Sequence, residues 1–172
     1  MAPDHGTALY AAIENNNNTM AQLLLSHGAN VDITNGNGRR ALNIGAFVSN
    51  LDGVRLLVEK DAAIDPDEDY WYGSALGAAA RNGHSEMVEY LLSKGWSPHR
   101  PMKTYGNFLT AAAMHNHVGV VDIILKKGER VPVLEMALQA APQRGYVAVV
   151  KAILTNFAKR LRKPHITAEP KC

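Results

Sequence analysis

The chain has 172 residues, of which 47% are hydrophobic and 6% aromatic, and its formal net charge is +2. This length suits a single domain of ordinary size, and so small a net charge does not by itself indicate nucleic acid binding. Because Cys172 is the single cysteine, an intrachain disulfide is excluded. No apolar run is long enough for a transmembrane helix. A cytoplasmic location is expected, with a nuclear one as the alternative.

Five leucines recur along the chain at nearly constant spacing, with steps of 33, 34, 33 and 29 residues between them. They are Leu9, Leu42, Leu76, Leu109 and Leu138. Nineteen residues after each leucine the chain has Gly28, Asp61, Gly95, Gly128 and Phe157. A period of this length indicates a repeat architecture, in which each unit buries its apolar face by stacking on its neighbours.

Each unit reads as a pair of helices. The first half is rich in small residues, as in Ala111–Ala113, which allow a neighbouring helix to approach closely. The second half carries apolar pairs at i, i+1, i+4 and i+5, which form one stripe on a helix rather than a strand face. The glycine that follows suits a left-handed helix C-cap. Left-handed backbone is also expected in the turn between the halves, at Asn16, Gly83, Asn116 and Gly145.

The third unit, "SALGAAARNGHSEMVEYLLSKG", resembles an ankyrin repeat, whose pattern runs T-P-L-H-x-A-A-x-x-G-H-x-x-V-V-x-x-L-L-x-x-G-A. The resemblance implies an all-α solenoid of stacked antiparallel helix pairs joined by hairpin fingers. It implies units at about residues 4–37, 38–71, 72–104, 105–133 and 134–158, followed by a basic tail at 159–172 that is expected to be partly disordered. Unit three matches the family pattern best and is expected to contribute most to stability.

The family places its binding residues on the finger tips, which the resemblance assigns in chain order to three segments. The finger "NGNGRR", with tight-turn signals, presents Arg39 and Arg40 before unit two. "DEDYWYG" presents Tyr70, Trp71 and Tyr72 before unit three, and "PMKTYGNF" presents Lys103 and Tyr105 before unit four. Tyr, Trp and Arg are enriched at interface hot spots, so we favour binding, although the aromatic cluster could instead fold back and shield the core.

The exposed face of each first helix is the second element of the expected concave surface. Its candidate residues are Phe47, Arg81, Asn82, Met114 and His115, together with Val48, Gln143 and Arg144. Trp96 follows Gly95, where the family has alanine, and we favour a packing role for it.

Unit five departs from the family pattern. Its connection to unit four is about four residues short, and Pro142 is expected to fall inside its first helix. Unit five is therefore predicted to be an irregular capping repeat. The threonine–histidine corner typical of the family is eroded in every unit, which predicts a less stable array.

No catalytic, metal or cofactor site is predicted. His115 and His117 are two residues apart, a spacing that splays them on a helix, and no phosphate loop or calcium loop has the required spacing. The expected function is a non-catalytic, monomeric scaffold, adaptor or inhibitor that binds a protein partner, without nucleic acid or membrane contact. The alternative is an enzyme or carrier for a small apolar molecule, with a groove formed by Phe47, Tyr70, Trp71, Tyr105 and His115.

Overall fold

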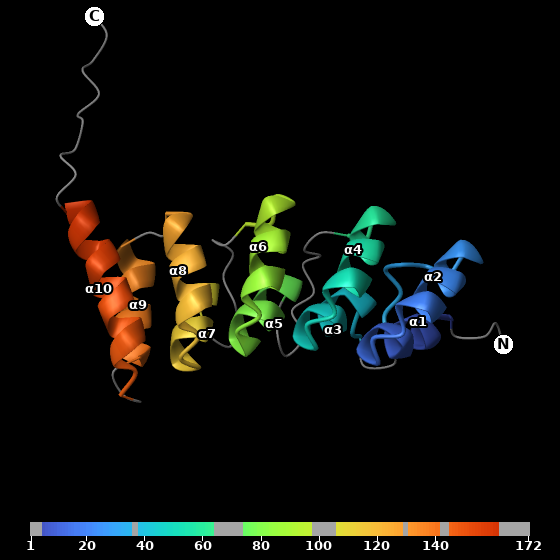
Figure 1. Ribbon diagram of the computed structural model, residues 1–172, viewed down its shortest axis with the longest axis horizontal. Coiled ribbons are helices and arrows are strands. Elements are labelled where there is room, and N and C mark those ends of the chain that lie inside the picture. Colours follow the sequence, from blue (N-terminus) through green and yellow to red (C-terminus); the bar gives the residue numbers. More distant parts are fainter. Residues whose placement is uncertain are drawn as a thin grey trace, which may run out of the picture.

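The computed structural model describes residues 5–35, 38–63, 74–97, 106–128, 131–141 and 145–161. These residues form five helix pairs stacked side by side along one axis (Figure 1). The pairs are α1 (His5–Glu14) with α2 (Asn18–Ser26), α3 (Ala41–Phe47) with α4 (Leu51–Glu59), α5 (Ala75–Asn82) with α6 (Ser85–Ser93), α7 (Phe108–Met114) with α8 (Val118–Lys126), and α9 (Val131–Ala140) with α10 (Val147–Leu161). The predicted all-α solenoid is confirmed.

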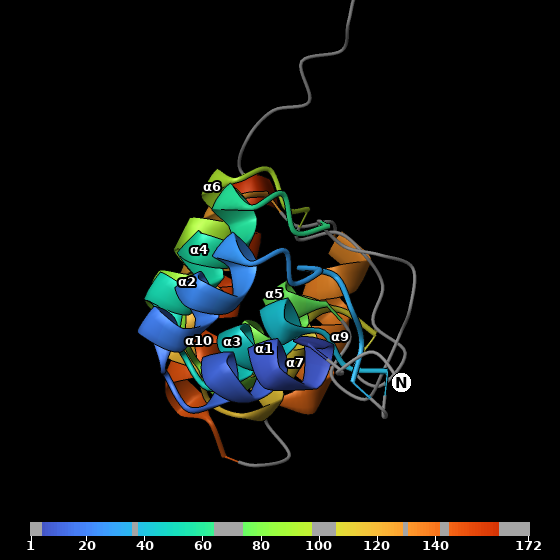
Figure 2. The ribbon, with the colours of Figure 1, turned by 90° about the vertical axis from the view of Figure 1, so that its right-hand side faces the viewer.

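The stack has two rows. The first helices of successive units pack against one another, and in the second row α2 packs against α4, α6 against α8 and α8 against α10 (Figure 2). Small residues make the close stacking of the first row possible. A Cβ added at Gly45 in α3 would lie 2.8 Å from a methyl carbon of Val54 and 3.0 Å from one of Ile13.

The core is most complete in units three and four. Six consecutive residues are buried in α5, Ala75–Ala80, and six in α7, Phe108–Ala113. The predicted apolar pairs of the second helices are also all buried in these two units: Met87, Val88, Leu91 and Leu92 in α6, and Val120, Val121, Ile124 and Leu125 in α8. The helical period inferred from the sequence is therefore confirmed.

The turns between paired helices contain left-handed residues at one fixed register position. The four predicted residues have positive φ, namely Asn16 at 55°, Gly83 at 77°, Asn116 at 62° and Gly145 at 71°. In unit two the position is taken by Ser49, with φ 65°, which the sequence did not indicate. The helix-ending position is left-handed as well, at Gly28, Gly95, Gly128 and, unusually for a residue with a side chain, Asp61.

The residue after each of the three inner turns links its unit to the preceding one. The Nδ2 of Asn50 donates a hydrogen bond of 2.9 Å to the carbonyl of Ile13. The Nε2 of His84 lies 2.8 Å from the Phe47 carbonyl, and the Nε2 of His117 lies 2.8 Å from the Arg81 carbonyl. Because a carbonyl oxygen can only accept, each ring nitrogen is the donor.

Unit five is irregular, as predicted, but its first helix is placed differently from the prediction. α9 begins at Val131, seven residues before Leu138, whereas α3, α5 and α7 each begin one residue before their leucine. The helix ends at Ala140, so the prediction that it contains Pro142 is wrong; Pro142 itself lies outside the described residues. Proline disfavours helical backbone at the residue before it, which explains why the helix ends ahead of Pro142. As a result Leu138 is half-buried, and Leu134 takes its place in the core with 0% exposure.

The last helix is also longer than its counterparts. α2, α4, α6 and α8 have nine residues each, while α10 has 15 and continues to Leu161, past the predicted end of the repeat domain at 158. Phe157 occupies the register position at which glycine ends α2, α6 and α8. Without a residue that prefers left-handed backbone there, the helix continues.

Candidate functional site

The first finger, residues 34–40, is a tight hairpin held by its own backbone. Asn35 and Arg39 exchange two hydrogen bonds: the Asn35 N–H donates to the Arg39 carbonyl, and the Arg39 N–H donates to the Asn35 side-chain oxygen, each at 2.9 Å. The Gly38 N–H closes the turn on the Asn35 carbonyl at 2.8 Å, with a φ of 70° at Gly38. The predicted tight turn is confirmed. Figure 2 shows the segment between α2 and α3 on the side away from the second helices.

The two arginines of the first finger have different environments. Arg39 is exposed. Arg40 is half-buried and its Nη1 lies 3.1 Å from the Oδ1 of Asp32. Asp32 also accepts from the Ala63 N–H at 2.9 Å, and so connects the first finger to the end of unit two. Arg40 therefore holds the finger in place, while Arg39 is the arginine that projects from it.

The candidate residues of the first helices lie at the carboxyl ends of α3, α5 and α7. Phe47, Arg81, Asn82, Met114 and His115 are all half-buried. The carbonyls of Phe47 and Arg81 accept the inter-unit histidine bonds, so both residues also contribute to stacking. Since the rest of α5 and almost all of α7 are buried, these helix ends supply the accessible part of the first-helix row in units three and four.

Seven predicted partner-binding residues lie outside the described residues: Tyr70, Trp71, Tyr72, Lys103, Tyr105, Gln143 and Arg144. Their role stays a prediction. Trp96 is 3% exposed and belongs to the hydrophobic core, which confirms the packing role favoured for it.

The sequence did not indicate the exposed surface of α9. Glu135, Met136 and Gln139 are exposed there, with Met136 at 44%. The Cε of Met136 lies over Gly106, where it would meet an added Cβ at 2.5 Å. Met136 could have been found from the register: it precedes its leucine by two residues, at the finger-side position of Arg40, Ser74 and Asn107.

Of the residues postulated to form a groove for a small molecule, Phe47 and His115 are described, and they lie in units that are not neighbours. Phe47 ends α3 and His115 follows α7, and α5 lies between those two helices in the stack. A pocket of about 380 Å³ is found instead between α8 and α10, and neither residue lines it. Within the described ranges no three His, Cys, Asp or Glu side chains are grouped so that they could hold a metal ion.

Tyr90, on the outer surface of α6, has a perturbed environment. Burial raises the pKa of its hydroxyl above the ordinary 10.0, and Glu59 raises it further, while Arg55 opposes the change. The Arg55 guanidinium and the Lys94 ammonium each lie 5.6 Å from the ring centroid, within the range of a cation–π contact. The contact of Arg55 with Tyr90 couples α4 to α6 on the surface opposite the first helices.

Comparison with known families decides the identity of this solenoid. A family model described as ankyrin repeats (3 copies) matches residues 2–70 and again residues 63–135. The chain belongs to the ankyrin repeat family. Ankyrin repeats are generally protein–protein interaction modules and are typically non-enzymatic. No helix in the described part of this ankyrin array is long and apolar enough to cross a membrane.

Two curated relatives share part of the ankyrin array. It is 38% identical over 65 residues to the mouse (Mus musculus) ankyrin repeat and SAM domain-containing protein 6, and 37% identical over 65 residues to the rat (Rattus norvegicus) protein of the same name. Each match spans 38% of this chain and 7% of the relative.

Proposed function

We propose that this ankyrin array is a non-catalytic module that binds a protein partner through its finger tips and the accessible ends of its first helices. The observation that carries the proposal is the fixed conformation of the first finger. Hydrogen bonds within the hairpin and the Asp32–Arg40 ion pair fix its backbone, and Arg39 projects from it exposed. A charged side chain on a preorganised loop binds with little loss of conformational entropy.

The aromatic finger is proposed to extend the same surface towards unit three. Tyr70, Trp71 and Tyr72 would act as central anchors, with Arg39, Arg81 and Lys103 around them, since buried aromatic residues dominate interface energy while charges at the rim mainly set the association rate. Scaffold, adaptor and inhibitor roles all use such a surface. The array is proposed to act as a monomer in the cytoplasm.

Affinity capture with two matched arginine variants tests the proposal. Arg39→Glu reverses a charge on the first finger. Arg55→Glu reverses a charge on α4, on the opposite surface, where the Arg55 side chain is 48% exposed. The proteins captured by the wild type should be retained by Arg55→Glu and lost or strongly depleted with Arg39→Glu, with both variants folded. Equal capture by both variants would remove the first finger from the binding surface.

The aromatic part of the proposal has its own test. Trp71→Ala is expected to change the free energy of unfolding by less than about 0.5 kcal/mol, as surface substitutions usually do. It should weaken the binding of the captured partner by ~2 kcal/mol or more. A lower melting temperature with unchanged affinity would mean that Trp71 shields the core.

A further inference from the structure

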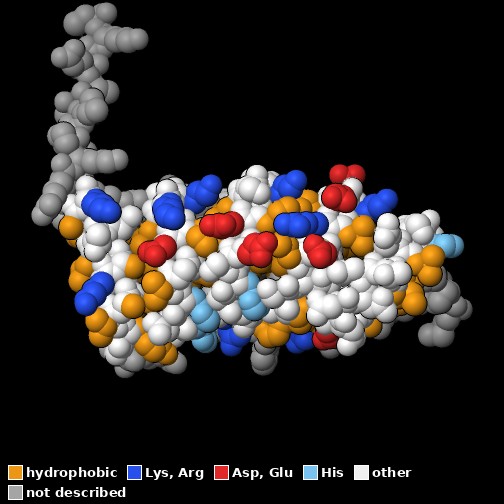
Figure 3. All heavy atoms as spheres, viewed as in Figure 1, with side chains coloured by type: hydrophobic (Ala, Val, Ile, Leu, Met, Phe, Trp, Pro, Cys, Tyr) orange, Lys and Arg blue, Asp and Glu red, His pale blue; other side chains and the backbone are white. Residues whose placement is uncertain are grey.

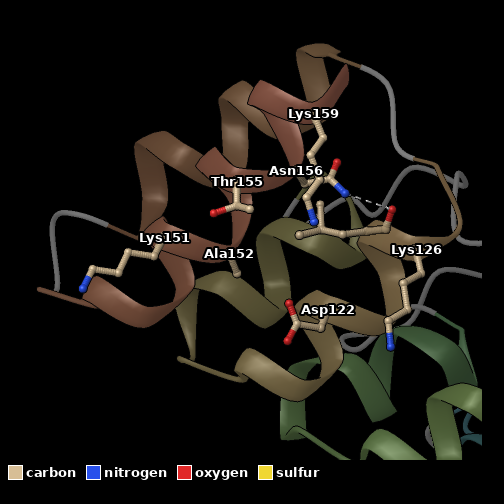
Figure 4. Close-up of a pocket in the computed structure, with 8 residues that line it drawn as sticks. Asp122, Lys126, Lys151, Ala152, Thr155, Asn156 and Lys159 are labelled. Atoms are coloured by element: carbon tan, nitrogen blue, oxygen red, sulfur yellow. Dashed lines mark hydrogen bonds between the residues drawn. The ribbon is translucent and has the colours of Figure 1, made fainter. Parts of the chain in front are cut away.

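The pocket between α8 and α10 includes one residue, Lys159, from the extended end of the last helix. Where α2, α6 and α8 end at a glycine, α10 continues past Phe157, and this extension places Lys159 beside the end of α8. In Figure 4, Lys159 points from α10 into the pocket, and Asn156 hydrogen-bonds the Leu125 carbonyl at its edge. The pocket therefore lies at the last unit junction of the described chain.

The lining of the pocket carries an excess of positive charge. Lys126 ends α8, while Lys151 and Lys159 lie two turns apart on one face of α10, and all three are exposed. Asp122 is the carboxylate among the lining residues. Neither of the ion pairs found between described residues involves these four side chains. The lining thus has three positive charges against one negative charge, a formal excess of +2.

The remaining lining residues suit a polypeptide side chain. Leu125 and Ala152 provide apolar surface, and the Thr155 hydroxyl lies between the two lysines of α10. Lys126 and Lys151 flank Asp122 from opposite sides in Figure 4. Their flexible four-carbon stems allow either ammonium group to reach over the pocket. A volume of about 380 Å³ is near the lower end for a ligand pocket, which suits one or two side chains.

The surrounding surface disfavours an extended polyanion. Over the second helices, Lys and Arg side chains alternate with Asp and Glu side chains (Figure 3). A nucleic acid or an anionic membrane lying along these helices would meet carboxylates such as Glu86, Glu89 and Asp122, which repel it. A short acidic segment anchored in the pocket would have Asp122 as the one carboxylate of these three that lines its site.

We propose that the pocket between α8 and α10 binds an acidic peptide segment of a protein partner, with Lys126, Lys151 and Lys159 holding its carboxylates. This surface is separate from the one proposed at the finger tips. Ammonium–carboxylate contacts in such an open pocket are screened by salt, so binding is strongest at low ionic strength.

Fluorescence anisotropy with a labelled octaglutamate peptide tests the proposal, with octaglutamine as the neutral control. The triple variant Lys126→Ala/Lys151→Ala/Lys159→Ala should bind octaglutamate about tenfold more weakly than the wild type, because exposed ion pairs contribute a few tenths of a kcal/mol to one kcal/mol each. The matched triple variant Arg55→Ala/Lys60→Ala/Lys94→Ala removes the same charge from α4 and from the residues that directly follow α4 and α6, and should change affinity by less than about twofold. Equal losses in both would show that only net charge matters and would overturn the proposal.

A pair of variants with the opposite effect makes the test sharper. Asp122→Asn removes the carboxylate of the pocket and should tighten octaglutamate binding about twofold or more, whereas Glu86→Gln, an equal charge change on α6, should not. Vesicles containing phosphatidylserine and a single-stranded RNA serve as competing probes. Failure of the wild type to bind octaglutamate at low ionic strength, or tighter lysine-dependent binding of either competing probe, would overturn the proposal.

Discussion

Units three and four bury apolar residues that units one and five leave exposed at the same register positions. Met87 in unit three is 1% exposed, but Met20 in unit one is 44% exposed. Leu92 in unit three is 7% exposed, and Leu154 in unit five is 48% exposed. Met20 and Leu154 lie on the outer sides of the described stack. In this array the energetic role of an apolar side chain therefore depends on whether a unit packs on each side of it.

The largest expected effect tests that comparison through side-chain truncation. Leu91→Ala, at a position with 0% exposure, should lower the free energy of unfolding by ~2–5 kcal/mol, because it leaves a cavity between packed helices. Leu154→Ala removes the same atoms from an exposed position and should cost less than about 1 kcal/mol. Urea denaturation of the two variants measures both values, and similar losses would show that the outer side of unit five is as well packed as the centre.

A second test uses two glycines with the same backbone conformation. Gly83 has φ 77° and Gly145 has φ 71°. A methyl group at Gly83 would overlap the His117 ring, whereas one at Gly145 would meet nothing within 4 Å.

Gly83→Ala should therefore cost ~2–4 kcal/mol, from backbone strain and overlap together, and Gly145→Ala ~1–2 kcal/mol, from strain alone. Thermal and urea unfolding of both variants give the comparison. A larger loss of unfolding free energy in Gly145→Ala than in Gly83→Ala would contradict this prediction.

The third test separates capping from contact between units. Asn17 and Asn50 both cap a second helix, by accepting from the N–H of Met20 and of Gly53. Asn50 also donates to the Ile13 carbonyl of the preceding unit and is buried.

Loss of the cap costs about 1 kcal/mol, and a buried carbonyl without its donor costs about 1–3 kcal/mol more. Asn50→Ala is therefore expected to lower the free energy of unfolding by ~2–4 kcal/mol, and Asn17→Ala by ~1 kcal/mol. A difference below about 0.5 kcal/mol in chemical denaturation would mean that the inter-unit bond adds nothing measurable.

The smallest expected effect concerns Tyr90, which occupies in unit three the register position of Ala152 in unit five. Because burial raises the pKa of its hydroxyl above 10.0, the unfolded chain loses this proton at a lower pH than the folded chain. The contribution of Tyr90 to the free energy of unfolding is fully present below about pH 10 and is lost as the pH rises above that value.

Tyr90→Phe should remove this part of the alkaline dependence while leaving stability near neutral pH within about 0.5 kcal/mol. Urea midpoints of the wild type and the variant, measured on either side of about pH 10, test the sign. A wild type that loses no more stability than the variant at high pH would contradict it.

Much of the fold could be inferred from local sequence. The leucine spacing placed the units, and the small-residue and paired-apolar halves indicated the two kinds of helix, because both patterns reflect the helical period. Asn16, Gly83, Asn116 and Gly145 could be assigned to left-handed turns because few residues tolerate that backbone. Ser49 and Asp61 escaped this reasoning, because they hold the left-handed backbone that these register positions require without being glycine or asparagine.

The candidate site was less predictable. Arg39 and Arg40 are adjacent and chemically identical, yet Arg40 pairs with Asp32 and Arg39 projects from the finger. That division depends on where Asp32 and Ala63 meet in space, which no local pattern encodes. The pocket between α8 and α10 was missed for a related reason: it requires the packing of α8 against α10, which brings Lys126 and Lys159, 33 residues apart in sequence, to one pocket.

The spacing of five leucines and the residues that follow them were sufficient to establish a helical solenoid, because each unit repeats the same local folding rules. Contacts between units set everything that distinguishes one unit from another. These include the buried centre, the outer sides with Met20 and Leu154, and the early start of α9, where Leu134 replaces Leu138 in the core. Stacking energy is shared between neighbours, so it depends on which surfaces meet and not on the residues of one unit alone.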